Sequence, residues 1–145
     1  MKIEVIVLDK KVQEFKKHMN NKARRLASAL AGQAGFLRKN VVIEVYLADG
    51  KRMRALNKKF LKKDKDTNVI SLVMPKDFPG LVAGEVYLNP LFIKKNRQDL
   101  DLMLVHGVLH ILGYDHAKKN DRIKMDKEEQ RLLSLISSSE TNFIV

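Results

Sequence analysis

Three of the chain's four histidines fall between positions 106 and 116, spaced as H-x3-H-x5-H. If the segment is helical, His106 and His110 lie on one face about one turn apart, a spacing that suits two imidazoles on one tetrahedral ion. Gly113 permits a sharp turn after the helix, so His116 can return a third imidazole to the same face. The spacing therefore predicts one divalent metal held by three histidines.

The structural alternative is a pair of buried histidines that hydrogen-bond to their neighbours. Two histidines on one face, with a third just past a glycine turn, favour the metal, because burying them unpaired costs roughly 1–3 kcal/mol per unsatisfied group. The chain has no cysteine, so the ligands must be nitrogen or oxygen. Structural zinc sites commonly use four protein ligands, whereas catalytic sites keep three and one open position. We therefore expect one catalytic zinc, with nickel or another divalent transition metal as alternatives.

A zinc protease is a competing interpretation, because H-E-x-x-H also places two histidines at this spacing. In that motif, the glutamate after the first histidine is the general base. Here that position is Gly107, which disfavours a protease. A glycine inside a helix costs up to about 1 kcal/mol relative to alanine. Its presence predicts the close approach of a substrate or of another segment of the chain.

The elements that must position these histidines can be predicted from apolar periodicity. The histidines lie in a predicted helix over 97–112 that is apolar on nearly every face, so we expect it to be central and buried. The other predicted elements are strands over 2–8, 41–47, 67–74 and 82–88, helices over 11–31, 50–61 and 120–136, and a helical turn at 89–90.

This order predicts one α+β domain over residues 1–145, with a small mixed four-stranded sheet and helices packed on it. The two strands between 67 and 88 should form a hairpin. Gly32 and Gly35 should end the first long helix, and residues 137–145 should fray.

The chain carries 28 lysines and arginines against 17 acidic residues, a net charge of +11. Such an excess on a small domain favours either a polyanionic partner or simply a soluble surface. We expect a cytoplasmic protein, since no apolar run is long enough to span a bilayer and the amino-terminal run is short and interrupted by Glu4. The remaining histidine, His18, should be solvated.

Residues 106–116, H-G-V-L-H-I-L-G-Y-D-H, resemble the signature of the YbeY family. The resemblance covers roughly residues 50–135 and continues through segments on both sides of the signature. These segments are Leu56-Asn57, 63–65, 67–71, Gly84-Glu85, Met125 and Glu129. It implies a metal-dependent, single-strand-specific endoribonuclease that takes part in ribosomal RNA processing and ribosome maturation. The implied partner is RNA, specifically ribosomal RNA or the small ribosomal subunit.

One position departs from the family pattern. Where the family typically carries an arginine thought to assist phosphate chemistry, this chain has Leu61. Lys62 or Lys63 can supply the charge, although lysine lacks the bidentate fork of arginine. A non-catalytic RNA- or ribosome-binding protein with a structural metal therefore stays open as the second interpretation.

Further candidates for the catalytic site are acidic. Asp115 is expected either to orient a ligand or water or to make a helix-terminal hydrogen bond. Glu85 is expected either to face the site or to face solvent. Lysine and arginine clusters on both sides of the histidine segment are typical of a phosphate-backbone track, although any one of them could be a solvated surface. They comprise 58–65, 94–97 and 118–119. Both water and a ribose 2′-OH remain candidates for the attacking group.

Overall fold

The computed structural model describes residues 1–31, 40–75, 77 and 79–137. The strands are β1 (Lys2–Val7), β2 (Val42–Leu47), β3 (Val69–Val73) and β4 (Val82–Leu88). The helices are α1 (Lys16–Ala31), α2 (Gly50–Leu61), α3 (Pro90–Lys95), α4 (Leu100–Ile111) and α5 (Lys119–Ser137), and a 3-10 helix (Lys10–Phe15) precedes α1. The predicted ends of the first helix at Gly32 and Gly35, and the predicted frayed tail beyond Ser137, lie outside the described residues.

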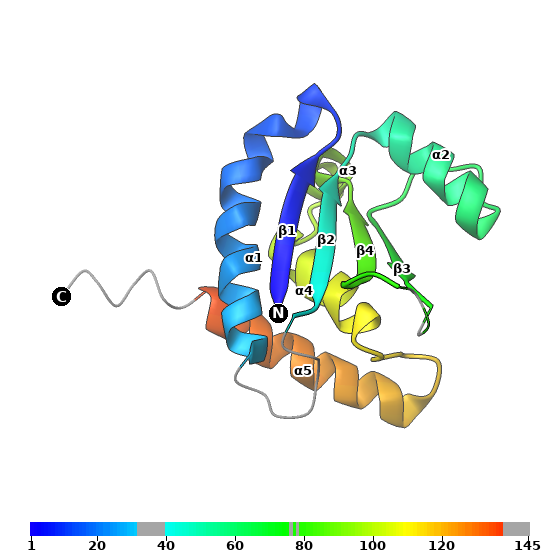
Figure 1. Cartoon of the computed structure of the whole chain (residues 1–145). Coiled ribbons are helices and arrows are strands. Elements are labelled where there is room, and N and C mark those ends of the chain that lie inside the picture. Colours follow the sequence, from blue (N-terminus) through cyan, green and yellow to red (C-terminus); the bar gives the residue numbers. More distant parts are fainter. Residues whose placement is uncertain (32–39, 76, 78, 138–145) are drawn as a thin grey trace.

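The four strands form one mixed sheet in the order β1-β2-β4-β3 (Figure 1). β1, β2 and β4 are parallel, and β3 pairs antiparallel with β4. The α+β class, the single domain and the hairpin of β3 and β4 are therefore confirmed. β3 is an edge strand, which matters for the site because different helices cover its two faces.

Successive side chains of each strand point to opposite faces of the sheet, so the sheet has two distinct faces. In β2 and β4, one face carries Ile43, Val45, Val86 and Leu88, which join α1, α4 and α5 in the main buried core. Figure 1 shows α4 passing behind the sheet and α5 crossing below it. The opposite face carries the stacked rings of Tyr46 and Tyr87, whose centroids are 4.8 Å apart.

α2 packs on this second face, at the β3 edge. Its buried Met53 and partly buried Leu56 join a small cluster with Ile70 and Leu72 of β3. Asp49 caps the helix by accepting a hydrogen bond from the Arg52 amide at 3.0 Å. The Arg52 guanidinium also donates two hydrogen bonds of 3.0 Å to Asp9, which ties α2 to the end of β1.

Two predicted helix starts differ from the structure. The helix predicted from residue 11 begins as a 3-10 turn and becomes an α-helix only at Lys16. α4 begins at Leu100 rather than near Arg97, because Asp99 caps it and accepts hydrogen bonds from the amides of Asp101 and Leu102. Among the described residues, no helix is long and apolar enough to cross a membrane.

Candidate metal centre

α4 lies close against the sheet because glycines occupy the contact. A Cβ on Gly107 would lie 2.6 Å from Cγ1 of Val86, and a Cβ on Gly84 would lie 2.5 Å from Cδ1 of Ile111. Ser71 of β3 also donates a hydrogen bond of 3.1 Å to the Gly107 carbonyl oxygen. The predicted close approach at Gly107 is therefore made by the sheet. A glutamate at this position would point into the sheet, so the arrangement of H-E-x-x-H is absent here.

The structure brings His106, His110 and His116 together. Each offers one ring nitrogen, and these nitrogens all lie within 4.8 Å of one another. The Nε2 atoms of His106 and His110 are 3.1 Å apart. Gly113, with φ of 98°, makes the turn that allows the chain to return to His116. His106 and His110 are partly buried and His116 is exposed, so the cluster has both a fixed side and an open side.

The outer nitrogens of the two helix histidines are already engaged. His106 Nδ1 lies 2.7 Å from Oε1 of Glu129, and His110 Nδ1 lies 3.1 Å from the carbonyl oxygen of Tyr114. A carboxylate and a carbonyl accept hydrogen bonds, so both Nδ1 atoms must donate. In a neutral imidazole, this leaves Nε2 with a lone pair. In the neutral state that metal binding requires, the two Nε2 lone pairs therefore face each other.

A cation between these nitrogens resolves the repulsion of two facing lone pairs. Two nitrogens bound at 2.0–2.1 Å to a tetrahedral zinc are separated by roughly 3.3 Å, close to the observed 3.1 Å. Engagement of the second ring nitrogen by a carboxylate or carbonyl is also typical of metal-binding histidines. The residues present thus fit a divalent ion with nitrogen ligands.

The electrostatics of the site favour the neutral form of His110. Burial, and then the neighbouring His106 and His116, lower the pKa of His110 below its usual value. Because only unprotonated histidine binds a metal, this shift keeps His110 competent as a ligand at neutral pH.

The contact between Glu129 and His106 was not predicted from the sequence. Glu129 is 8% exposed and lies on the buried side of α5 with Met125, Leu132 and Ile136. A carboxylate is rarely buried unless it has a partner. The signal in the sequence was thus an acidic residue at a core position of an amphipathic helix.

Asp115 lies beside the cluster but makes a local contact. Its Oδ1 accepts a hydrogen bond of 2.7 Å from the backbone amide of His116. This bond shapes the turn that presents His116, and the Asp115 side chain is otherwise exposed.

The structure does not bring Glu85 to the histidines. Gly84 and Val86 face α4, so the alternation of β4 directs Glu85 to the opposite face of the sheet. There it accepts a hydrogen bond of 3.2 Å from the Tyr87 hydroxyl. Burial, and then the charge of Glu85, raise the pKa of Tyr87 to about 12.

Lys62 and Lys63 follow α2, which packs on the opposite face of β3 from α4. They are therefore not among the residues gathered around the histidines. Lys62 ends the helix in the left-handed conformation, with φ of 60°. Leu61, the last residue of α2, has no charge and is 50% exposed.

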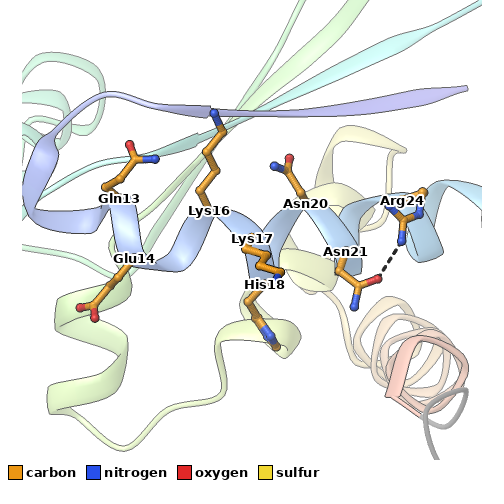
Figure 2. Close-up of a pocket in the computed structure, with 8 residues that line it drawn as sticks. All are labelled: Gln13, Glu14, Lys16, Lys17, His18, Asn20, Asn21 and Arg24. Carbon is orange, nitrogen blue, oxygen red and sulfur yellow. Dashed lines mark hydrogen bonds between the residues drawn. The ribbon is translucent and has the colours of Figure 1, made fainter.

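A concave surface runs along the 3-10 helix and α1 and is separate from the histidine cluster. Figure 2 shows its lining, in which Lys16, Lys17 and Arg24 outnumber the single acid Glu14. His18 contributes to this surface, and its Nε2 lies 2.7 Å from Oδ1 of Asp101. His18 is thus half-exposed and also hydrogen-bonded to Asp101, where the sequence predicted only solvation.

The chain is similar to known proteins both in sequence and in fold. The family model described as "Endoribonuclease YbeY" matches residues 5–137. The protein called Endoribonuclease YbeY from Aquifex aeolicus is 34% identical over 69% of this chain and 73% of its own length. The protein of the same name from a Wolbachia strain of Drosophila simulans is 31% identical over 91% of this chain and 93% of its own. The solution structure of a Thermotoga maritima protein, 20% identical, aligns with a TM-score of 0.60 over 97% of this chain and 92% of its own.

Proposed function

Because the chain belongs to the endoribonuclease YbeY family, we propose that it is a metal-dependent endoribonuclease that cuts single-stranded RNA. The proposed substrate is ribosomal RNA during ribosome maturation in the cytoplasm. The observation that carries the proposal is the convergence of three histidine nitrogens within 4.8 Å, with two of the rings oriented by Glu129 and by the Tyr114 carbonyl.

In this proposal, His106, His110 and His116 hold one zinc-type ion. When bound, such an ion polarises a phosphoryl oxygen and lowers the pKa of a coordinated water to about 7. Glu129 fixes the orientation of His106 and raises its basicity as a ligand. Asp115 holds the turn that presents His116. The exposed side of the cluster leaves room for a phosphodiester to approach.

The net charge of +11 supports RNA as the substrate. Exposed cations occur on the elements before and after the histidine cluster, and they can contact phosphates on either side of the cut. They are Lys58, Lys59, Lys62, Lys63, Lys65, Lys94, Lys95, Arg97, Lys118 and Lys119. In this arrangement Lys62 and Lys63 bind backbone phosphate and do not take part in the chemical step.

The uncharged Leu61 supports a second candidate function, that of a non-catalytic RNA- or ribosome-binding protein with a structural metal. Leucine cannot neutralise the charge that develops on a phosphate during cleavage. A protease is disfavoured because position 107, where that mechanism needs its base, faces the sheet.

Incubation of the full chain with single-stranded and duplex RNA, with zinc and with chelator, tests the two candidates. A ribonuclease should cut the single strand with zinc and lose this activity with chelator or in His110→Ala. Leu61→Arg should cut faster than wild type, because it restores a bidentate phosphate contact. If wild type and Leu61→Arg both leave RNA intact with zinc present, the chain is the binding protein.

A further inference from the structure

The C-terminal end of α2 exposes an aromatic ring. Phe60 is 44% exposed and its neighbour Leu61 is 50% exposed. Among the phenylalanines and tyrosines that the structure describes, Phe60 is the only exposed one, and the others are partly buried. Phe60 therefore presents an apolar ring to solvent at the end of a charged helix.

Phe60 lies on the apolar stripe of α2 but beyond the part that the sheet covers. Met53 and Leu56 precede it at spacings of seven and four residues, on the side of the helix that packs against Ile70 and Leu72. Met53 is fully buried, Leu56 is partly buried and Phe60 is exposed. The apolar stripe thus extends beyond the part of α2 that packs on the sheet, and Phe60, its last member, is exposed to solvent.

The surroundings of the ring are cationic. Lys58, Lys59, Lys62 and Lys63 are all exposed next to it in sequence, and the Lys59 ammonium lies 5.2 Å from the ring centroid. The nearest acidic residue in sequence is Asp64. Its Oδ1 lies 2.8 Å from Nε of Arg54, so this carboxylate is already ion-paired. An apolar partner alone would gain nothing from these charges, whereas a single-stranded nucleic acid offers both a base to stack and phosphates to neutralise.

The backbone after the helix holds these lysines in place. The Lys63 amide donates to the Asn57 carbonyl oxygen at 3.2 Å, and the buried Asn57 side chain donates to the Lys65 carbonyl oxygen at 2.9 Å. Lys62 has φ of 60°, a conformation that favours glycine and costs a lysine roughly 1 kcal/mol. The chain nevertheless carries a charged side chain there, beside Phe60.

We infer that Phe60 is a stacking platform for an unpaired base of the RNA, with Lys59, Lys62 and Lys63 on the adjacent phosphates. The inference rests on the proposed function for its ligand, RNA. Stacking tolerates any base, so this contact would select single strands over duplexes without reading a sequence. It lies on the opposite face of β3 from the histidines, so a bound strand would pass around this edge of the sheet.

The absence of tryptophan from the chain allows a direct test. In Phe60→Trp, the new indole is the only one, and stacking on a base should quench its fluorescence. The probe is a single-stranded oligoadenylate, with an abasic strand of equal length as the comparison. Leu135→Trp on α5 is the matched control, since Leu135 is similarly exposed at 47%. We expect quenching only for Phe60→Trp, and only with the strand that carries bases.

Affinities of the other variants separate stacking from a general apolar contact. Phe60→Ala and Phe60→Leu should both bind the oligoadenylate roughly tenfold more weakly than wild type. The abasic strand should bind all three proteins equally. Equal affinity of Phe60→Leu and wild type for the oligoadenylate would overturn the inference, as would equal quenching of the Leu135→Trp control.

A gel of the same RNA after each measurement distinguishes this inference from the proposed function. Quenching at Phe60→Trp with uncut RNA would support stacking and argue against the ribonuclease. Cut RNA, together with wild-type affinity in Phe60→Ala, would support the ribonuclease and overturn the stacking platform.

Discussion

Glu129, on the buried side of α5, lies 2.7 Å from Nδ1 of His106 on α4. This contact joins the last helix to the candidate metal centre, because a carboxylate partner at Nδ1 fixes the ring and directs Nε2 toward His110. The two segments are 23 residues apart in sequence. Their contact depends on how α5 packs against α4.

Replacement of Glu129 by glutamine tests this orientation. The amide is close to the carboxylate in size but carries no charge, so His106 becomes a weaker ligand. We expect metal affinity to fall by about 10- to 100-fold, measured by competition with a chromogenic chelator. Asp126→Asn on the exposed side of α5 is the control and should bind metal as wild type does. Equal affinities in all three proteins would mean that Glu129 does not support the site.

Metal content is the second prediction. Purified wild-type protein should carry about one zinc-type ion per chain, because three neutral imidazoles suit zinc and nickel better than magnesium. Elemental analysis should find little metal in His110→Ala. The fourth histidine provides the control, since His18 pairs with Asp101 outside the cluster, and His18→Ala should retain the ion. Loss of metal from both variants would point to a general folding defect.

The ion should also stabilise the fold, because its ligands come from α4 and from the turn that leads to α5. Binding to the native state adds about 4 kcal/mol to the free energy of unfolding when free metal is a thousandfold above its Kd. A chelator should therefore lower the Tm of wild type clearly, and should leave the Tm of His110→Ala unchanged. A wild-type Tm that does not respond to chelator would contradict a bound ion.

The part of the site that could be predicted from sequence is the part set by local geometry. Helical periodicity alone places His106 and His110 on one face, and a glycine turn allows His116 to return. Glu129 required knowledge of how α5 packs on α4, which no local pattern gives. The face on which Glu85 lies was predictable in principle. Val86 and Leu88 alternate with Glu85 and Tyr87 and mark the buried face of β4, so Glu85 must lie on the other face.

For the fold as well, local sequence patterns predicted some features, and others depended on specific contacts. The class and the hairpin followed from the order of apolar segments, whereas the start of α4 depended on a cap. Asp99 accepts hydrogen bonds from two amides of the first turn, and such a cap can form at any of several polar residues in this segment. The sequence alone therefore placed the start near Arg97, a few residues too early.

The link between Asp9 and Arg52 predicts a pH dependence of stability. The Arg52 guanidinium holds the pKa of the Asp9 carboxyl below its ordinary value of 3.8. Because the folded state has the lower pKa, the stabilisation is present above that ordinary value and is lost as the pH falls through the folded value. Urea denaturation of wild type should show this loss below about pH 4, and Asp9→Asn should show a smaller loss. Asp64→Asn, which removes a more exposed ion pair, should resemble wild type more closely.

Lys62 allows charge and folding to be separated in one substitution. Its left-handed backbone, with φ of 60°, is easier for glycine, so Lys62→Gly should fold at least as stably as wild type. If Lys62 contacts RNA phosphate, the variant should bind single-stranded RNA more weakly. The slope of log affinity against log salt should become less steep by about 0.7, the value for one phosphate contact on a single strand. Lys2→Ala, on the far edge strand β1 and paired with Glu4, should keep the wild-type slope. If Lys62→Gly keeps the wild-type slope as well, Lys62 lies outside the path of the RNA, and α2 contributes to binding only through Phe60 and the remaining lysines.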